Sequence, residues 1–82
     1  MNKDEPKKKP KTIFFFDKEP ALKTIQEIVN GYITILYLGD GRTMYVNEDG
    51  ILLNLPINKK ASKMVGFEVF GKAIVINNNK ST

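Results

Sequence analysis

The sequence predicts a small α+β domain with the element order β-α-β-β-β-α-β, in which one main helix packs on an antiparallel three-stranded meander. Three observations predict it. Residues 32–55 hold β-forming segments separated by two glycine turns, residues 21–30 carry apolar side chains at helical spacing, and residues 58–65 have the start and stop signals of a second helix. A chain of 82 residues has room for one hydrophobic core and a shallow groove.

The composition argues against several kinds of chemistry. The chain has no cysteine and no histidine, so it lacks a disulfide framework, thiolate metal ligands and the commonest general base. We therefore expect no catalytic residues, no metal site and no cofactor. No apolar run approaches the roughly 20 residues needed to cross a membrane, and no signal-peptide hydrophobic region follows the basic start. We expect a cytoplasmic protein without a membrane partner.

The positive charge is concentrated at the start of the chain. The net charge is +4, and residues 1–11 contribute five lysines against two carboxylates. With two prolines and no large apolar residue after Met1, this segment is predicted to be a disordered basic arm. Residues 12–77 would form one domain and residues 78–82 a polar tail. The arm is either a solubilising terminus or a contact to nucleic acid through Lys7, Lys8, Lys9 and Lys11.

Residues 12–16 predict the first strand. Phe14, Phe15 and Phe16 follow one another, so apolar side chains would point to both faces. Both faces should then be covered, or one should meet a partner. These three phenylalanines are the predicted protein-contact residues. Residues 21–30 predict the main helix, which the Asn30-Gly31 pair would end.

The meander is predicted from residues 32 to 55. Residues 32–38 are apolar at almost every position, which is typical of a central strand. The Asp40-Gly41 pair favours a two-residue hairpin with both residues at positive φ. Residues 43–47 would return, and residues 47–50 form a longer turn. Residues 51–55 would make the third strand, and strand candidates at 67–69 and 72–77 follow the second helix.

The second helix carries the candidate anion site. Asn58 is predicted to cap residues 59–65, and Gly66 to end them. Lys59 and Lys60 stand in the first turn, where cations oppose the helix dipole by roughly 0.3–1 kcal/mol. Free N–H groups and two ammonium groups there would bind a phosphate or a carboxylate, with Arg42 as a possible bidentate helper. Alternatively, both lysines simply point into water.

Three tyrosines, Tyr32, Tyr37 and Tyr45, alternate along the predicted hairpin. Aromatic side chains on a sheet face beside lysines can stack on the bases of single-stranded nucleic acid. Such tyrosines more often pack against each other across strands.

Residues 22–76 resemble an uncharacterised domain family of phages, plasmids and bacterial mobile elements. That family has a helix ending in Gly-Gly-Tyr-Ile, a hairpin, a Val-Asn-Glu-Glu-Gly turn, and then Leu-Pro-x-Asn-Arg-Arg-Ala. The matching residues here are Asn30, Gly31, Tyr32, Ile33, Val46, Asn47, Glu48, Asp49, Gly50, Leu55, Pro56, Asn58, Lys59, Lys60 and Ala61. Lysines replace the arginine pair, which keeps the charge but loses the planar guanidinium fork.

The resemblance implies a genomic setting rather than a chemistry. Small non-catalytic phage proteins often act by occupying a host component. We therefore predict an accessory protein that inhibits a bacterial defence component in the host cytoplasm, either by blocking an effector protein or by sequestering a nucleotide signal. One alternative is a nucleic-acid-binding accessory protein that uses the basic arm with Lys59 and Lys60. Another is a structural subunit that forms a homo-oligomer.

Overall fold

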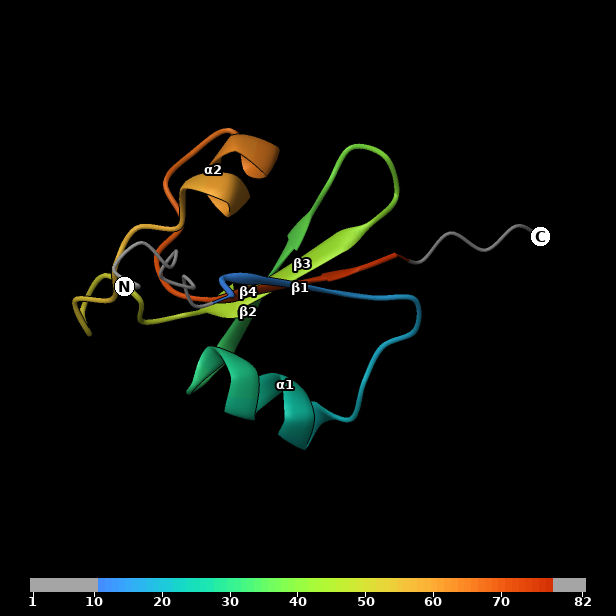
Figure 1. The fold of residues 1–82 in the computed structure, drawn as a ribbon, viewed down its shortest axis with the longest axis horizontal. Helices are drawn as coiled ribbons and strands as arrows, with labels where there is room; N and C mark the ends of the chain where they lie inside the picture. Colours follow the sequence, from blue (N-terminus) through green and yellow to red (C-terminus); the bar gives the residue numbers. More distant parts are fainter. Residues whose placement is uncertain (1–10, 78–82) are drawn as a thin grey trace, which may run out of the picture.

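The computed structural model describes residues 11–77 and confirms the α+β class (Figure 1). Its order is β-α-β-β-α-β, one strand fewer than predicted. The elements are β1 (Ile13–Phe16), α1 (Leu22–Val29), β2 (Ile33–Tyr37), β3 (Thr43–Asn47), α2 (Lys59–Val65) and β4 (Ala73–Ile76).

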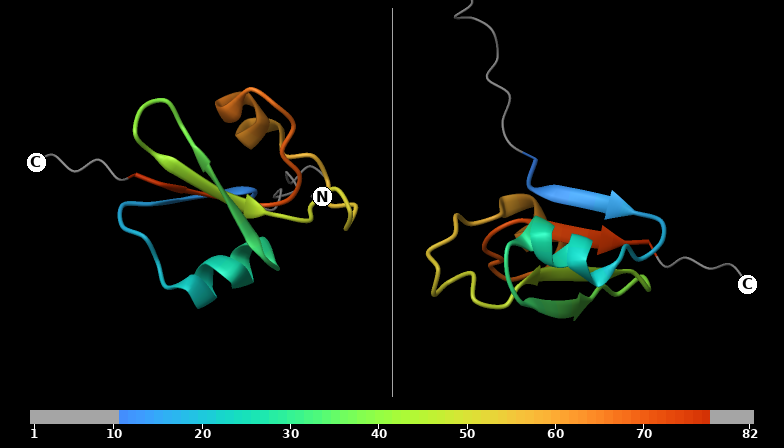
Figure 2. Two further views of the ribbon diagram at one scale, coloured as in Figure 1. Left: turned by 180° about the vertical axis from the view of Figure 1, so that it is seen from behind. Right: turned by 90° about the horizontal axis from the view of Figure 1, so that it is seen from below.

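The four strands form one sheet in the order β1-β4-β3-β2, with β1 at one edge and β2 at the other (Figure 2). β1 runs parallel to β4, while the other two pairings are antiparallel. The prediction that residues 32–38 form a central strand is therefore wrong. A nearly continuous apolar run indicates burial on both faces, yet the buried strands are β3 and β4.

The predicted third strand of the meander, residues 51–55, is also absent. Residues 48–54 form successive turns, in which the Leu53 N–H donates to the Asp49 carbonyl (2.9 Å) and the Leu55 N–H to the Gly50 carbonyl (3.0 Å). The free edge of β3 is taken by β4 instead. Residues 67–69 likewise form no strand, and the nearby β-bridge joins Ile57 and Phe70.

The hairpin between β2 and β3 has a three-residue loop rather than the predicted two-residue turn. The Leu38 N–H donates to the Arg42 carbonyl at 2.9 Å, and the Gly41 N–H donates to the Leu38 carbonyl at 3.2 Å. Gly41 has φ 94°, whereas Asp40 does not have positive φ. This is the type I turn with a glycine bulge that commonly closes three-residue hairpins.

Both predicted helix ends are confirmed. α1 ends at Asn30, which adopts the left-handed conformation at φ 65°, and α2 ends at Gly66 with φ 87°. The side chain of Asn58 caps α2 by accepting a hydrogen bond from the Ala61 N–H. These short-range signals place the start of α2 where the sequence predicts it.

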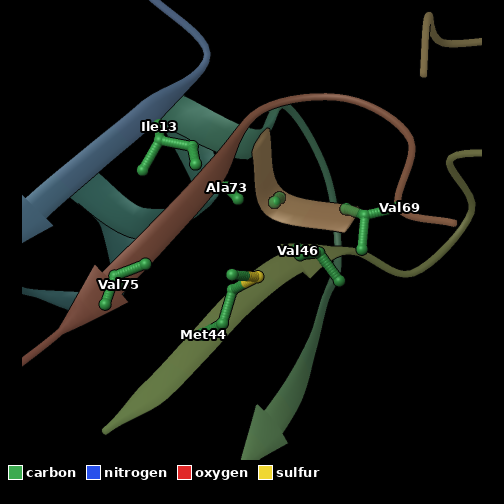
Figure 3. Packing of buried hydrophobic residues seen from close by; sticks show 7 residues of the cluster. Ile13, Met44, Val46, Val69, Ala73 and Val75 are labelled. Carbon is green, nitrogen blue, oxygen red and sulfur yellow. The ribbon is translucent and has the colours of Figure 1, made fainter. Parts of the chain in front are cut away.

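The sheet lies between the two helices, with α1 on one face and α2 on the other (Figure 1). Both faces are packed, so a single covering helix is an incomplete description. The α1 face holds a cluster of Ile25, Val29, Tyr45, Ile74 and Ile76. The α2 face holds a second cluster, of Ile13, Met44, Val46, Ala61, Val69, Ala73 and Val75 (Figure 3).

Candidate functional site

The side chain of Asn58 is buried and fully used by the fold. Its Oδ1 accepts from the Ala61 N–H (3.0 Å), and its Nδ2 donates to the carbonyls of Thr12 (2.9 Å) and Gly71 (2.8 Å). One residue thus caps α2 and ties it to the chain entering β1 and β4. The Ala61 N–H and the Asn58 amide are consequently not free to hold an anion. The backbone N–H groups of Lys59 and Lys60 and their exposed side chains remain, and the anion site stays a prediction.

Arg42 lies away from these lysines and has its own partner. Its Nη2 is 2.8 Å from Asp40 Oδ2, its Nε donates to the same oxygen at 2.9 Å, and its N–H donates to Oδ1 at 3.1 Å. The guanidinium hydrogen bond holds the pKa of Asp40 below its ordinary value. Arg42 precedes Thr43, which pairs with Ile76, the last residue of β4. Asn58 instead donates to the carbonyl of Gly71, which lies just before the first residue of β4. The two groups therefore lie towards opposite ends of the sheet.

The three predicted protein-contact residues have different environments. Phe14 and Phe16 pack against the α1-face cluster and are half-buried. Phe15 points to the other face of the edge strand and is 62% exposed. Of the trio, Phe15 is the one well placed to contact a partner.

The residues predicted to contact nucleic acid are only partly within the described chain. Lys7, Lys8 and Lys9 lie outside residues 11–77. The Lys11 Nζ lies 5.1 Å from the ring centroid of Phe14, a cation–π distance.

The three tyrosines lie in different environments. Tyr45 is buried in the α1-face core, and burial, with the nearby carboxylate of Glu19, raises its pKa. Tyr32 and Tyr37 are exposed. Tyr45 therefore packs as a core residue, while the other two have free ring surface.

The structure contains a groove that the sequence analysis missed. It has a volume of about 230 Å³ and lies beside β2 and β3 on the α2 side of the sheet. We call it the acidic groove, since its lining combines apolar side chains with three carboxylates. Its apolar side chains are Leu36, Val46, Ile51, Leu52, Phe67, Val69 and Phe70, and its carboxylates are Glu48, Asp49 and Glu68.

Large apolar side chains around the acidic groove face solvent. Leu52 is 81% exposed and Phe67 is 56% exposed, and Ile51 and Leu53 are exposed as well. Solvent-facing apolar side chains that gather in one place mark interaction surfaces more often than chance. The sequence signal for this surface is the apolar run 51–53, whose composition predicts a strand although the residues form turns.

The loop that presents these side chains is held by close backbone packing. A Cβ on Gly50 would lie 2.7 Å from the Phe70 carbonyl oxygen, so only glycine fits there without a shift. The Gly71 N–H donates to the Pro56 carbonyl at 2.8 Å, and the Asn58 N–H donates to the Val69 carbonyl at 2.7 Å. The loop and residues 67–71 therefore form one packed unit, and the groove between them is built into the fold.

A second cavity, of about 500 Å³, lies where the end of α1 meets the starts of β1 and β4. Lys11 and Lys72 line it, opposed by the carboxylate of Glu27. Its apolar lining includes Ile28, Leu55, Pro56 and Ile57, and Asn58 also lines it. Neither Lys59 nor Lys60 lines either cavity.

Two classes of site are missing from residues 11–77. No three acidic side chains in this part of the chain come close enough to hold a metal ion. In the same residues, neither helix has the length or apolar content needed to span a bilayer.

The chain belongs to the domain-of-unknown-function family DUF3846, whose model matches residues 4–82. The expected resemblance to a domain family of unknown function is confirmed at that level, and the match extends beyond residues 22–76 at both ends. Neither the curated proteins nor the solved structures gave a match.

Residues of the pattern that indicated this resemblance have structural roles. Asn47 Nδ2 donates to the carbonyls of Val29 (3.0 Å) and Asn30 (3.2 Å), which fixes the end of α1 to β3. A Cβ on Gly31 would lie 2.9 Å from that same Nδ2. With Gly50 and Asn58, these residues hold the loops and helix ends in place. These residues of the pattern therefore stabilise the fold.

Proposed function

We propose that this domain is a non-catalytic binding module whose partner is a protein that inserts apolar side chains into the acidic groove. The observation that carries the proposal is a group of exposed apolar side chains that line a preformed hollow, namely Ile51, Leu52 and Phe67. Buried aromatic and aliphatic anchors in pockets supply most of the binding energy at protein interfaces.

The size and charge of the acidic groove favour this class of partner. Its volume of about 230 Å³ is below the range of roughly 300–1,000 Å³ that is typical of small-molecule sites. It suits one or two anchoring side chains better than a whole nucleotide. Glu48, Asp49 and Glu68 would favour a partner with lysine or arginine beside the anchor.

The resemblance to phage, plasmid and mobile-element proteins supplies the biological setting of the proposal. In that setting the partner would be an effector protein of a bacterial defence system, blocked in the host cytoplasm by occupation of its surface. The action requires no catalytic group from this chain.

Recovery of the partner from bacterial lysate tests the proposal when wild type and variants are compared. Leu52→Ser and Phe67→Ser should each reduce the amount of partner recovered by about tenfold or more, as expected when an anchoring side chain is truncated. Leu22→Ser is the matched control, because Leu22 is 58% exposed but lies on α1, away from the groove. Equal loss with all three variants, or with none, would refute the groove as the site.

A second candidate function is the binding of a nucleotide signal. It is favoured by the cavity of about 500 Å³ that Lys11 and Lys72 line, since this volume falls within the small-molecule range. Calorimetry with mono- and dinucleotides would test it. Binding that weakens with Lys72→Ala, and not with the groove variant Phe67→Ser, would support the candidate. No heat with any nucleotide would eliminate it.

Nucleic-acid binding through the basic arm, with Lys59 and Lys60, stays a further alternative. Phosphate contacts make affinity fall steeply between about 50 and 200 mM salt, whereas binding through apolar anchors should change little. A salt titration of whichever complex is recovered separates the two.

A further inference from the structure

The edge strand β2 lacks the devices that protect sheet edges from pairing. Such edges usually carry lysine, proline or a bulge. Residues 31–39, GYITILYLG, contain no charge and no proline. The strand pairs with β3 in continuous register from Ile33 to Tyr37, so no bulge interrupts it. Within residues 11–77, no strand pairs with its outer side.

The hydrogen bonds around the hairpin show which backbone groups face outward. The Glu48 N–H donates to the Tyr32 carbonyl at 2.9 Å, and the Leu38 N–H donates to the Arg42 carbonyl at 2.9 Å. Bonding to a neighbour alternates along an antiparallel strand, so the even-numbered residues of β2 bond to β3. The N–H and C=O groups of Ile33, Ile35 and Tyr37 therefore point away from the sheet.

The side chains of these residues extend the α1-face core to the sheet edge. Ile35 lies opposite the buried Tyr45, and Tyr45 lies opposite Ile74. Ile33 packs against the α1-face cluster, while Ile35 is 41% exposed and Tyr37 is 78% exposed. The edge thus offers outward backbone groups together with uncovered apolar side chains.

We propose that β2 pairs antiparallel with β2 of a second copy of this chain, about a two-fold axis at Ile35. Ile35 then faces its own equivalent, and Ile33 faces Tyr37 of the other copy. All three outward-facing residues fall in hydrogen-bonded pairs, each of which exchanges two bonds. Isoleucine beside tyrosine is a favourable cross-strand pair.

A second copy fits this edge better than an unrelated strand. Self-pairing of a charged strand would place like charges opposite each other, and β2 has none. The strand has an odd number of residues, centred on Ile35, so the two-fold axis pairs every residue. Because β2 is the edge strand of its sheet, the two sheets would continue into one another, and the two-fold axis would put both α1 helices on one face.

The pairing also has a consequence for the acidic groove. Thr34 and Leu36 line that groove on the opposite face of β2. Two paired copies would therefore present two acidic grooves side by side on one surface. This self-association goes beyond the proposed function and does not depend on it, because it is measured without any partner.

Sedimentation velocity of the full chain at several concentrations tests the proposal. We expect a reversible species with the mass of two chains. Ile35→Pro removes an outward N–H without removing a bond to β3, and Tyr37→Lys adds a charge at the edge. Both should sediment as single chains. Phe15→Lys, at the opposite edge of the sheet, should leave the dimer intact.

Hydrogen exchange of wild type gives a second readout that needs no variant. The amides of Ile33, Ile35 and Tyr37 should exchange at least tenfold more slowly at concentrations where the dimer forms. A single-chain mass at every concentration, or a dimer that persists in both folded variants, would overturn the proposal. So would a dimer in which these amides exchange as fast as those of an exposed loop.

Discussion

Replacement of Asn58 by alanine should destabilise the domain by about 3 kcal/mol, because three different contacts are lost together. Loss of the helix cap costs about 1 kcal/mol. The Gly71 carbonyl loses its side-chain donor, at a cost of about 1–2 kcal/mol. The Thr12 carbonyl also accepts from the Ala73 N–H at 2.9 Å, so it keeps a partner and loses only about 0.5–1 kcal/mol.

Urea unfolding followed by circular dichroism measures this loss. Small domains have total stabilities of roughly 0.05–0.15 kcal/mol per residue, so the variant should unfold at far lower urea. Asn58→Ser keeps the cap acceptor but is too short to reach both carbonyls, and it should lose less. Lys60→Ala is the neighbouring control, with a change below about 0.5 kcal/mol, since the side chain is exposed.

The reasoning would be refuted by a loss below about 1 kcal/mol in Asn58→Ala, which is the value expected for the cap alone. It would also be refuted if Asn58→Ser were as unstable as Asn58→Ala. The first result would mean that the ties to β1 and β4 contribute nothing. The second would mean that the cap contributes nothing.

Three further predictions concern single positions. Burial raises the pKa of Tyr45, so the folded state keeps a proton that the unfolded state loses; stability should hold below about pH 10 and fall above it, and Tyr45→Phe should weaken that fall in urea unfolding across pH 8–11. Gly50→Ala should lower the melting temperature because its Cβ would meet a backbone oxygen at 2.7 Å, whereas Gly39→Ala, with no atom within 4 Å, should not; equal melting temperatures would contradict the packing described for the loop. The hydrogen bond from the Arg42 guanidinium lowers the pKa of Asp40 from its ordinary value, so the ion pair stabilises the folded state at neutral pH and that stabilisation is lost as the pH falls through the lowered pKa; an NMR titration should show Arg42→Ala moving the pKa back up, and an unmoved pKa would exclude the ion pair.

The sequence was sufficient for features that depend on neighbouring residues. Asn30 and Gly66 end their helices, and Asn58 begins α2, because capping is decided within one helical turn. The fold class also follows from such local signals. The length of the hairpin loop was missed because Asp40 uses its carboxylate to bind Arg42 and does not take positive φ.

Features that depend on distant residues could not be predicted. Residues 51–55 have strand-like composition, but β4 takes the free edge of β3 from a position more than twenty residues further along the chain. No local pattern distinguishes a segment that pairs with β3 from one of similar composition that does not. The same competition leaves Ile51, Leu52 and Leu53 in solvent. The acidic groove was therefore invisible in the sequence, although its apolar residues were not.

The predicted anion site, which stays untested, depends on groups that distant residues can occupy. Asn58, Lys59 and Lys60 do begin a helix, yet the asparagine is committed to three hydrogen bonds within the fold. Lysines in the first turn of a helix indicate an anion site only if the neighbouring N–H groups and side chains are free to bind the anion. Sequence spacing cannot show that, because Thr12 and Gly71, which occupy the asparagine, lie far from it along the chain.

Site-specific photo-crosslinking in bacterial cells is the most direct test of a protein partner in the acidic groove. A photoreactive amino acid at position 52 should give a discrete adduct with one partner protein. The adduct should weaken when Glu68→Lys replaces one of the three carboxylates of the groove lining with a cation, and the same reagent at position 22 should give none. Equal adducts from both positions, or an adduct at position 52 that Glu68→Lys leaves unchanged, would contradict the account.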